Sequence, residues 1–567
     1  MKRLATLILI LTTFFVFGQG DISTYPTNYF SNPLNIPLVL SGTFGELRTN
    51  HFHAGIDIKT EQKEGLNVIA AAGGYVSRIK VSLWGYGKVL YVTHPNGYTS
   101  VYAHLQKFNN QIEAYVKKQQ YKKESYEIHL FPKAGELPVT KDEILAFSGS
   151  TGGFVGPHLH FEIRDTKTEK PINPFYFGIK VKDSKKPRIN SLMGYSLTEN
   201  THINKVNAPV QLSYRKLENG DYLASTIKAF GEIGFGVNVY DQLDGAYNKN
   251  GLYSLSLAVN GKTIHEFRAT SFSFYETKYI NLLVDYERLE KLNQRVQKTF
   301  TEPSNKLNMY NTSLNKGYIS VEDGLSYTAT IVAKDFKGNE QKITIPIVGK
   351  KESSVVSKPI KKTPYKINKS EFNKFNKENV TVAFPKNTFY NDFYLDFDVI
   401  ETVAKIHTPT IPLDKKYTLT FDVSKYSEAD KKQLYITSVD QNGKTSYQTT
   451  VKKESTFYTT TKNLGKYTLK KDTVQPSIKL HNIKNEQWLT HFKTLQVKIS
   501  DNESGIKSYR GEIDGEWILM EYNVKNGLLT YNFSDKTFTE AKHELKVVVT
   551  DNVGNTSELK ATFFRKK

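Results

Sequence analysis

Two short histidine-containing segments, about one hundred residues apart, carry side chains that could bind a metal ion. The first is the run HFHAGID from His51 to Asp57, and the second is the run GPHLHFE from Gly156 to Glu162. A further histidine, His104, lies between them. A metal ion that must hold a reactive water is typically bound by three imidazole or carboxylate groups, with its fourth position left open. The two segments therefore predict a metal site suited to hydrolysis.

The spacing of His158 and His160 predicts a β-strand. Residues i and i+2 of a strand lie on the same face, roughly 6–7 Å apart. The apolar Phe161 and Ile163 that follow, and the glycines that precede, are typical of a short strand entered from a loop. One imidazole can then bind the metal. The other lies further from the metal, at the distance expected of a group that transfers protons to or from the bound water or the substrate.

The spacing of His53 and Asp57 requires a bend. On a straight strand these side chains would be separated by roughly 13 Å, too far to share an ion. Gly55 lies between them and permits the chain to bend. A helix would also bring positions i and i+4 together, but a central glycine and the β-branched Ile56 and Ile58 argue against one. We therefore expect a strand that bends at Gly55.

The segment from about Gly42 to Asp165 resembles the lysostaphin-like zinc metallopeptidases, the M23 peptidase family, whose signature is H-x-x-x-D followed by H-x-H. Several separated motifs appear in the same order as in that family. Beside the two segments above, they are the runs VIAAAG (68–73), VTHPNGY (92–98), YAHL (102–105) and FSGSTG (147–152).

The resemblance implies a function for five residues. His53, Asp57 and His160 are expected to bind one zinc ion, and His104 and His158 are expected to be the catalytic pair. In such sites zinc polarises the scissile carbonyl and lowers the pKa of its water, one histidine takes the water proton, and another stabilises the oxyanion or protonates the leaving amine. The resemblance leaves open which histidine does which. It implies a zinc metalloendopeptidase that cleaves stem peptides or cross-links of bacterial peptidoglycan.

Other polar residues close to these motifs are weaker candidates. His51 could bind metal as an i, i+2 partner of His53, but the family pattern does not include it. His94 precedes a Pro-Asn-Gly run and is expected in a turn between two strands. Glu162 and Asp165 could orient the metal-binding histidine through a hydrogen bond. Carboxylates at such positions are more often solvated, so we expect both to lie outside the site.

An insertion at residues 106–138 departs from the family pattern. Some thirty residues, including His129 and the run KKQQYKKE (117–124), replace a short connection. Long loops beside a site are often lids or binding elements. The insertion therefore either shapes specificity or is a solvated surface segment.

The N-terminus predicts export. Met1–Arg3 and the apolar run Leu4–Phe17, followed by small residues, are typical of a signal peptide spanning residues 1–20, and this run is too short to cross a membrane comfortably. No other segment is predicted to cross a membrane, so the mature protein is expected in the periplasm, outside the cell or at the cell envelope. The chain has no cysteine, which excludes disulfides and a lipid-bearing cysteine.

The charge of the chain favours an anionic partner. Its 77 basic and 57 acidic residues give a net charge of +20. Export and the absence of nucleic-acid-binding motifs favour anionic envelope polymers over nucleic acid. The lysines are scattered, so a role in solubility alone is the other interpretation.

The rest of the chain is expected to form β-domains, because short alternating apolar runs are separated by Asn-Gly and Asp-Gly turns. We predict a mainly β protein in which an N-terminal antiparallel β metallopeptidase domain (21–180) is followed by immunoglobulin-like β-sandwich domains. Those are residues 183–350 and 472–567, with a linker rich in Lys, Ser and Pro at 351–370 and a further, dissimilar β-domain at 371–470.

An internal repeat supports the two immunoglobulin-like domains. Lys182-Asp183 and DFKGN (335–339) match Lys471-Asp472 and DNVGN (551–555), and Asn260-Gly261 matches Asp514-Gly515. These domains either position the enzyme on the wall or on a protein partner, or act as spacers.

An alternative function is that of a catalytically gated or silent family member that activates other enzymes or binds the envelope, but retention of all five site residues argues against it.

Overall fold

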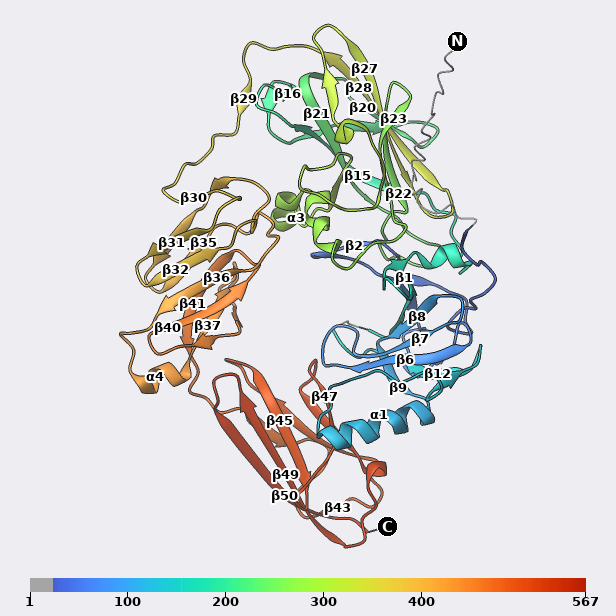
Figure 1. Ribbon diagram of the computed structural model, residues 1–567, viewed down its shortest axis with the longest axis vertical. Coiled ribbons are helices and arrows are strands. Elements are labelled where there is room, and N and C mark those ends of the chain that lie inside the picture. Colours follow the sequence, from blue (N-terminus) through green and yellow to red (C-terminus); the bar gives the residue numbers. More distant parts are fainter. Residues whose placement is uncertain (1–23, 154–155, 567) are drawn as a thin grey trace, which may run out of the picture.

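The computed structural model describes residues 24–153 and 156–566, so the predicted signal peptide lies outside the described residues. The prediction of a mainly β chain with an N-terminal antiparallel domain and further β-domains is confirmed. In Figure 1 four β-rich parts follow one another around a ring, and the last part lies beside the first. Within the described ranges, no helix is both long and apolar enough to cross a membrane.

The N-terminal domain is built on one large antiparallel sheet with the strand order β1-β4-β13-β8-β7-β6-β10. A second, three-stranded sheet has the order β5-β12-β9. The strands of both sheets are β1 (Leu40–Gly42), β4 (Ile56–Lys59), β5 (Asn67–Ile69), β6 (Gly74–Val81), β7 (Lys88–Thr93), β8 (Tyr98–Ala103), β9 (Leu105–Phe108), β10 (Ile128–Leu130), β12 (Ile144–Ser148) and β13 (His158–Asp165). Short strands β11 (Pro138–Val139) and β14 (Pro171–Ile172) pair with β6 and β13, and β2 (Leu47–Arg48) pairs with β3 (His51–Phe52).

The core of this domain lies between the two sheets. Apolar residues of both sheets belong to one buried cluster, which includes Ile58, Leu90 and Phe161 from the large sheet and Val68 and Leu145 from the small one. Strand β13 lies near the middle of the large sheet and is buried along nearly its whole length. Polar side chains on β13 are therefore enclosed and must find partners within the protein.

The chain bends at Gly55, between β3 and β4, as the sequence predicted. A Cβ atom at this position would lie 2.2 Å from the carbonyl oxygen of Phe161 on β13. Glycine is therefore required for close approach of two main chains as well as for the bend. This approach brings the segment that carries His53 against the strand that carries His160.

The insertion contains helix α1 (Asn110–Lys123), which the sequence analysis did not predict. The side chain of Asn109 caps its N-terminus by accepting a hydrogen bond from the Ile112 amide. Ile112 and Val116 are buried in the core of the N-terminal domain. Other residues of α1 contact the last domain of the chain, at the bottom of the ring in Figure 1.

The second part forms a mixed sheet with the main path β25-β23-β22-β27-β28-β21-β16-β17-β29. Its longer strands are β15 (Arg188–Ser196), β21 (Ile227–Tyr240), β22 (Ser254–Val259), β23 (Lys262–Arg268), β27 (Ser326–Lys334) and β28 (Glu340–Gly349). Its shorter strands and helices are β16 (His202–Ile203), β17 (Val206–Asn207), β18 (Val210–Leu212), β19 (Tyr214–Lys216), β20 (Tyr222–Ala224), β24 (Val296–Lys298), β25 (Tyr310–Ser313), β26 (Ile319–Val321), β29 (Val356–Ser357), α2 (Ile280–Leu283) and α3 (Tyr286–Leu292).

An apolar cluster joins this second part to the N-terminal domain. Phe44, Phe52 and Ala54 pack in one buried cluster with residues of the second part that include Phe267 and Phe272. The Phe52 amide also donates a hydrogen bond of 2.8 Å to the Thr277 hydroxyl. Since Phe52 and Ala54 flank His53, the position of this candidate ligand depends on both domains.

The third part contains two five-stranded sheets that enclose one apolar core. Tyr365 and Ile367, which we predicted in the linker, pack in or against this core. The elements are β30 (Lys366–Ile367), β31 (Asn373–Lys377), β32 (Val380–Phe384), β33 (Phe393–Tyr394), β34 (Phe397–Ile400), β35 (Val403–Ile406), β36 (Tyr417–Asp422), α4 (Glu428–Gln433), β37 (Leu434–Val439), β38 (Thr445–Tyr447), β39 (Val451–Lys452), β40 (Thr456–Thr461) and β41 (Gly465–Lys471).

The last part has a four-stranded and a five-stranded sheet around its own core. Its strands are β42 (Ser477–Leu480), β43 (Gln487–Trp488), β44 (Thr494–Ser500), β45 (Ile506–Ile513), β46 (Glu516–Trp517), β47 (Met520–Asn523), β48 (Leu528–Asn532), β49 (Lys542–Asp551) and β50 (Thr556–Phe564). The β45–β46 hairpin turns at Asp514-Gly515, and the β22–β23 hairpin of the second part turns at Asn260-Gly261. All four turn residues have left-handed conformations, typical of tight hairpin turns.

The last part closes the ring by ion pairs with the N-terminal domain. Lys117 of α1 lies 2.6 Å from Asp535, and Arg510 lies 2.6 Å from Glu124. Lys88 on β7 is nearly enclosed and lies 2.9 Å from Glu521 on β47. The insertion therefore contributes a docking surface for the C-terminal end of the chain.

Candidate metal centre

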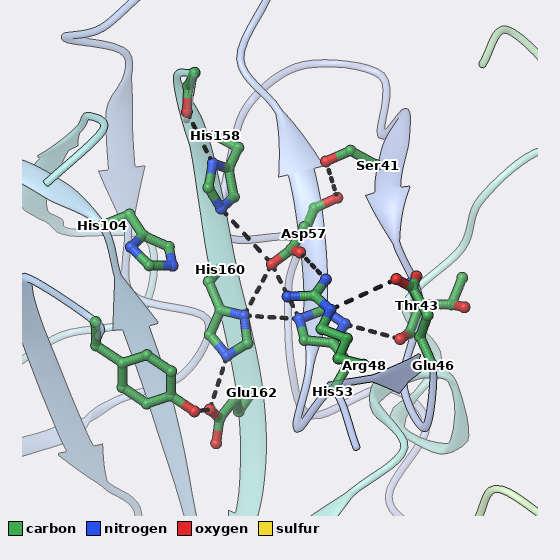
Figure 2. A network of polar contacts seen from close by, with 12 residues as sticks. Ser41, Thr43, Glu46, Arg48, His53, Asp57, His104, His158, His160 and Glu162 are labelled. Atoms are coloured by element: carbon green, nitrogen blue, oxygen red, sulfur yellow. Dashed lines mark hydrogen bonds and ion pairs between the residues drawn. The ribbon is translucent and has the colours of Figure 1, made fainter. Parts of the chain in front are cut away.

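Three neighbouring strands bring the candidate ligands together. Strand β13 pairs with β4 on one side, where His160 is opposite Asp57, and with β8 on the other, where His160 is opposite Ala103. His104 follows directly after β8, and the bend at Gly55 turns His53 toward Asp57. Figure 2 shows the four histidine and aspartate side chains at this end of the sheet together with His158.

His53, Asp57 and His160 form a compact triangle of possible ligand atoms. The His53 Nε2 atom lies 3.0 Å from Asp57 Oδ1 and 2.9 Å from His160 Nδ1, and His160 Nδ1 lies 2.9 Å from Asp57 Oδ1. All three side chains are buried. Ligands that bind one zinc ion tetrahedrally, at about 2.0 Å each, lie roughly 3.3 Å apart. The triangle is close to that size.

The tautomers of both imidazoles direct lone pairs into this triangle. His53 Nδ1 donates a hydrogen bond of 2.8 Å to the carbonyl oxygen of Thr43, and His160 Nε2 donates one of 2.7 Å to Glu162 Oε1. In the neutral rings each donor nitrogen carries the only ring proton, so His53 Nε2 and His160 Nδ1 then have lone pairs. Without a metal, His160 Nδ1 holds a second proton that it donates to Asp57 Oδ1, and a divalent cation would take the place of that proton. The donor set therefore fits zinc.

Burial and charge act in opposite directions on these groups. Burial lowers the pKa of His53 to about 4, although Asp57 favours its charged form. Burial also opposes charge on His160, but hydrogen bonds to Asp57 and Glu162 raise the pKa of this histidine to about 9. Burial disfavours the Asp57 carboxylate, but His53 and His160 hold the pKa of Asp57 well below its usual value. The carboxylate is therefore charged and available to a cation.

Glu162 holds His160 from behind, so our expectation that Glu162 is solvated and lies outside the site was wrong. The side chain is fully buried and also accepts hydrogen bonds from the Tyr86 hydroxyl and from Arg164 Nε, the latter at 2.6 Å. The signal was present in the sequence, because Glu162 lies two residues after His160 and thus on the same face of the strand. Asp165, by contrast, caps a turn by accepting a hydrogen bond from the Thr168 amide.

Arg48 holds the other oxygen of Asp57. Its Nη2 atom lies 2.5 Å from Asp57 Oδ2, while Oδ1 points into the triangle. Glu46 in turn lies 3.5 Å from Arg48 Nε. Because Oδ2 is engaged by the guanidinium, Asp57 is arranged to offer one oxygen to a metal ion. Figure 2 shows this chain of contacts from Glu46 through Arg48 to Asp57.

His104 and His158 lie next to each other beside the triangle. Their ring centroids are 4.6 Å apart, and the ring of His104 is 5.9 Å from that of His160. The Nε2 atom of His158 lies 3.8 Å from Asp57 Oδ1. His104 has a left-handed backbone with φ of 60°, which is uncommon for a residue with a side chain and often marks a functional site.

Main-chain carbonyls fix the orientation of both rings. His104 Nδ1 donates to the Thr151 carbonyl at 2.9 Å, and His158 Nδ1 donates to the Gly156 carbonyl at 3.1 Å. Each ring then has its lone pair on Nε2. Burial lowers the pKa of both histidines, to about 3 for His104, where the neighbouring histidines also contribute. Both imidazoles are therefore neutral near pH 7 and can accept a proton.

The other histidines near the two segments lie apart from the triangle. His51 is exposed and donates from Nδ1 to the Thr49 carbonyl at 2.8 Å. His94 lies between β7 and β8 and is hydrogen-bonded to the Gly73 carbonyl and to Ser100. His129 is on β10, where its Nε2 accepts from Arg78 at 2.8 Å.

Comparison with known proteins gives an independent view of the same domain. Residues 51–121 match peptidase family M23, and residues 364–472 match a Zu5-like domain. The chain is 34% identical over 128 residues to the DD-carboxypeptidase/endopeptidase Mpg of Neisseria meningitidis, a match that covers 23% of each protein. It is 29% identical over 160 residues to the cell division protein DipM of Caulobacter vibrioides, covering 28% of this chain and 22% of DipM. The chain thus spans about a quarter of the length of these relatives.

Among solved structures, the catalytic domain of lysostaphin from Staphylococcus simulans matches 25% of this chain and 91% of that domain, with 22% identity and a TM-score of 0.19. The match to peptidase family M23 falls on the domain that contains the His53–Asp57–His160 triangle. The N-terminal domain of this chain belongs to peptidase family M23.

Proposed function

We propose that the protein is an exported zinc metalloendopeptidase that hydrolyses peptide bonds in bacterial peptidoglycan, with His53, Asp57 and His160 as the ligands of one zinc ion. The observation that carries the proposal is the convergence of two imidazole nitrogens and one carboxylate oxygen within 3.0 Å of one another. A zinc ion held there would act as a Lewis acid on the scissile carbonyl and lower the pKa of a water molecule.

His104 and His158 are the catalytic residues in this proposal. Both rings present Nε2 as an acceptor, because Nδ1 of each donates to a main-chain carbonyl. One ring takes the proton from the attacking water, and a protonated ring can stabilise the developing oxyanion or donate to the leaving amine. The two rings are equivalent in these respects, so the order of their roles stays open.

The substrate class is supported by relatives and by charge. The Neisseria protein is named for carboxypeptidase and endopeptidase activities, and the net charge of +20 suits a polyanionic envelope. A cavity of about 640 Å³ between the N-terminal domain and the second part is lined by Lys249 and Arg295, among others. These cations would complement the carboxylates of wall stem peptides.

A second candidate function is that of a gated enzyme or activator that responds to a partner. Lys525 of the last part donates a hydrogen bond of 2.5 Å to the Ser150 carbonyl, next to Thr151, whose carbonyl holds His104. Movement of the last part would therefore reach the segment that orients a catalytic histidine. Binding of a protein or of an anionic envelope polymer to the C-terminal β-domains is one way to cause such movement.

The first experiment is mass spectrometry of purified peptidoglycan incubated with the mature, zinc-loaded protein. We expect new stem-peptide fragments that disappear with a zinc chelator and in His158→Ala, and that persist in His129→Ala, a control far from the triangle. His160→Ala should lose both zinc and activity. Unchanged peptidoglycan, in the presence of bound zinc, would contradict constitutive hydrolysis of the wall and favour the gated function.

A further inference from the structure

Three aspartates converge where the second part meets the N-terminal domain. Asp183 lies ahead of β15, Asp241 directly follows β21, and Asp335 directly follows β27. One carboxylate oxygen of each lies within 4.8 Å of the others. Asp183 and Asp335 belong to the repeated motifs that the sequence analysis used to predict two related domains. Acidic side chains from three separate loops are therefore brought together.

The surroundings of this cluster leave its negative charge largely uncompensated. Asp241 and Asp335 are only 3% and 4% exposed. None of the three carboxylates has an ion-pair partner among the described residues. Asp335 accepts hydrogen bonds from the amide and side chain of Asn339, and Asp183 accepts one from the Lys185 amide. Buried carboxylates this close together repel unless they bind a proton or a cation.

Asp241 gives an independent indication of a ligand. Its Oδ1 atom is buried and has no hydrogen-bond partner within residues 24–153 and 156–566. Buried polar atoms are nearly always paired, so such an atom points to a missing partner. Burial and the charges of Asp183 and Asp335 raise the pKa of Asp241 to about 8. The repulsion between carboxylates that favours a proton on Asp241 would also favour a bound cation.

A small cavity lies at this cluster. It has a volume of about 30 Å³ and is lined by all three aspartates together with Thr43, Asn173 and Tyr253, among other residues. A site for one water molecule needs roughly 10–15 Å³ on this scale, so the cavity can hold an ion with a water molecule. Thr43 and Asn173 belong to the N-terminal domain, so the cavity lies at the junction of two parts of the chain.

We propose that Asp183, Asp241 and Asp335 bind a calcium ion at this junction. The donors are oxygens only, which favours calcium or magnesium over zinc. Calcium accepts six to eight oxygens at about 2.3–2.6 Å, so its ligand atoms lie up to roughly 5 Å apart. That range includes the 4.8 Å limit within which the three carboxylate oxygens lie. Magnesium requires a tighter octahedron and retains more water.

The last part repeats the arrangement with Asp472, Asp501 and Asp551, again within 4.8 Å of one another. Here main-chain amides already engage the carboxylates: Asp472 accepts from Val474 and Ser504, and Asp551 Oδ1 accepts from three successive amides. No oxygen comparable to Asp241 Oδ1 is buried without a partner in the described part of this cluster. The proposal is therefore confined to the second part.

The proposed calcium site is connected to the candidate metal centre through Thr43. Asp241 and Asn250 exchange two main-chain hydrogen bonds, and the amide of the next residue, Gly251, donates to the Thr43 hydroxyl at 3.1 Å. The Thr43 carbonyl accepts the hydrogen bond from His53 Nδ1. A calcium ion that fixes Asp241 would therefore also help to fix the segment that orients His53.

The test is titration of the full mature, zinc-loaded protein with CaCl₂, followed by calorimetry and thermal unfolding. We expect one calcium per chain and a rise in Tm of roughly 5–10 °C at saturation. Asp241→Asn should bind calcium at least about tenfold more weakly. At a pH above 8, where Asp241 is charged, this variant removes one of three repelling charges, so it should unfold at a higher temperature than the wild type without calcium, and at a lower one with it.

Two variants of similar chemistry serve as controls. Asp285→Asn changes a buried aspartate of the same part that caps α3 and accepts from the Tyr195 hydroxyl, and it should keep the full calcium response. Asp501→Asn should also keep it. Should Asp241→Asn fail to fold, the half-buried Asp183→Asn replaces it. The proposal would be overturned if CaCl₂ gave the wild type neither binding heat nor a shift in Tm. It would also be overturned if Asp501→Asn lost the calcium response while Asp241→Asn kept it.

Discussion

His160 donates a hydrogen bond from Nε2 to Glu162 Oε1 at 2.7 Å, and this contact leaves Nδ1 as the atom directed at the metal triangle. The two residues are neighbours on one face of β13. Outer partners of metal-binding histidines fix the tautomer and increase the basicity of the ligand. Tyr86 and Arg164 hold Glu162 in turn, so three side chains together fix the orientation of the candidate ligand atom.

Replacement of Glu162 by glutamine should weaken zinc binding without unfolding the domain. The amide lacks the charge that favours the Nε2–H tautomer, so we expect roughly 10–100-fold lower zinc affinity. Competition with a chromophoric chelator measures this affinity, and circular dichroism checks the fold. Asp165→Asn, on the same strand but engaged in a surface turn, should bind zinc like the wild type. Equal zinc affinity of Glu162→Gln and wild type would show that Glu162 does not position the ligand.

Arg48 should matter for zinc affinity through Asp57. Loss of the 2.5 Å contact in Arg48→Met frees Asp57 Oδ2 and leaves its charge less compensated, so both zinc affinity and kcat should fall. Arg48→Lys keeps the charge but not the planar guanidinium, and its effect should be intermediate. A zinc titration of the two variants beside wild type separates the roles of charge and geometry. An unchanged affinity in Arg48→Met would contradict this role.

Removal of zinc should destabilise the N-terminal domain. Without a cation, Asp57 and both imidazoles stay buried, and His160 must hold an extra proton to hydrogen-bond Asp57, so the apo site is less stable. At a zinc concentration about 1,000 times Kd, binding contributes ~4 kcal/mol to the free energy of unfolding. Thermal unfolding with and without chelator measures this difference. His160→Ala should have a Tm as low as that of the chelator-treated wild type, whether or not chelator is present. A wild type whose Tm does not change with chelator would exclude a structural contribution of the metal.

Gly55→Ala should move β4 away from β13. The added Cβ would lie 2.2 Å from the Phe161 carbonyl oxygen, and a main-chain neighbour cannot rotate away. We expect a loss of about 1–3 kcal/mol in stability, or more, together with weaker zinc binding. Gly73→Ala is the matched control, because its Cβ would have no contact shorter than 3.6 Å. Similar stabilities of the two variants, measured by denaturant unfolding, would refute the requirement for close approach at Gly55.

Glu521→Gln should release the last part from the N-terminal domain. The change leaves the enclosed Lys88 without its ion-pair partner, while Glu521 itself is 43% exposed. We expect a loss of about 1–3 kcal/mol, below the value for a fully buried pair. Faster hydrogen exchange in α1 and β47 would report the release. Glu516→Gln, which alters a solvent-exposed ion pair with Lys536, should leave this exchange unchanged.

Much of the site could be predicted from the sequence because it depends on local spacing. The strand containing His158 and His160 and the bend at Gly55 follow from residue types within a few positions. The family motifs then indicated which histidines to group. The helix α1 was missed because only Ile112 and Val116 of its residues are buried with the core, so its apolar periodicity is weak.

The sequence by itself determined the residue types of the site, the β character of the chain and the repeated aspartate-containing motifs. Only the tertiary structure decided which atoms meet. Antiparallel pairing of β13 with β4 and β8 fixed the triangle, and burial of β13 turned Glu162 from an expected surface carboxylate into the partner of His160. The junction aspartates come from three loops between residues 183 and 335, and the last part docks on α1 through Lys117 and Asp535, 418 positions apart, so no local pattern specifies these contacts.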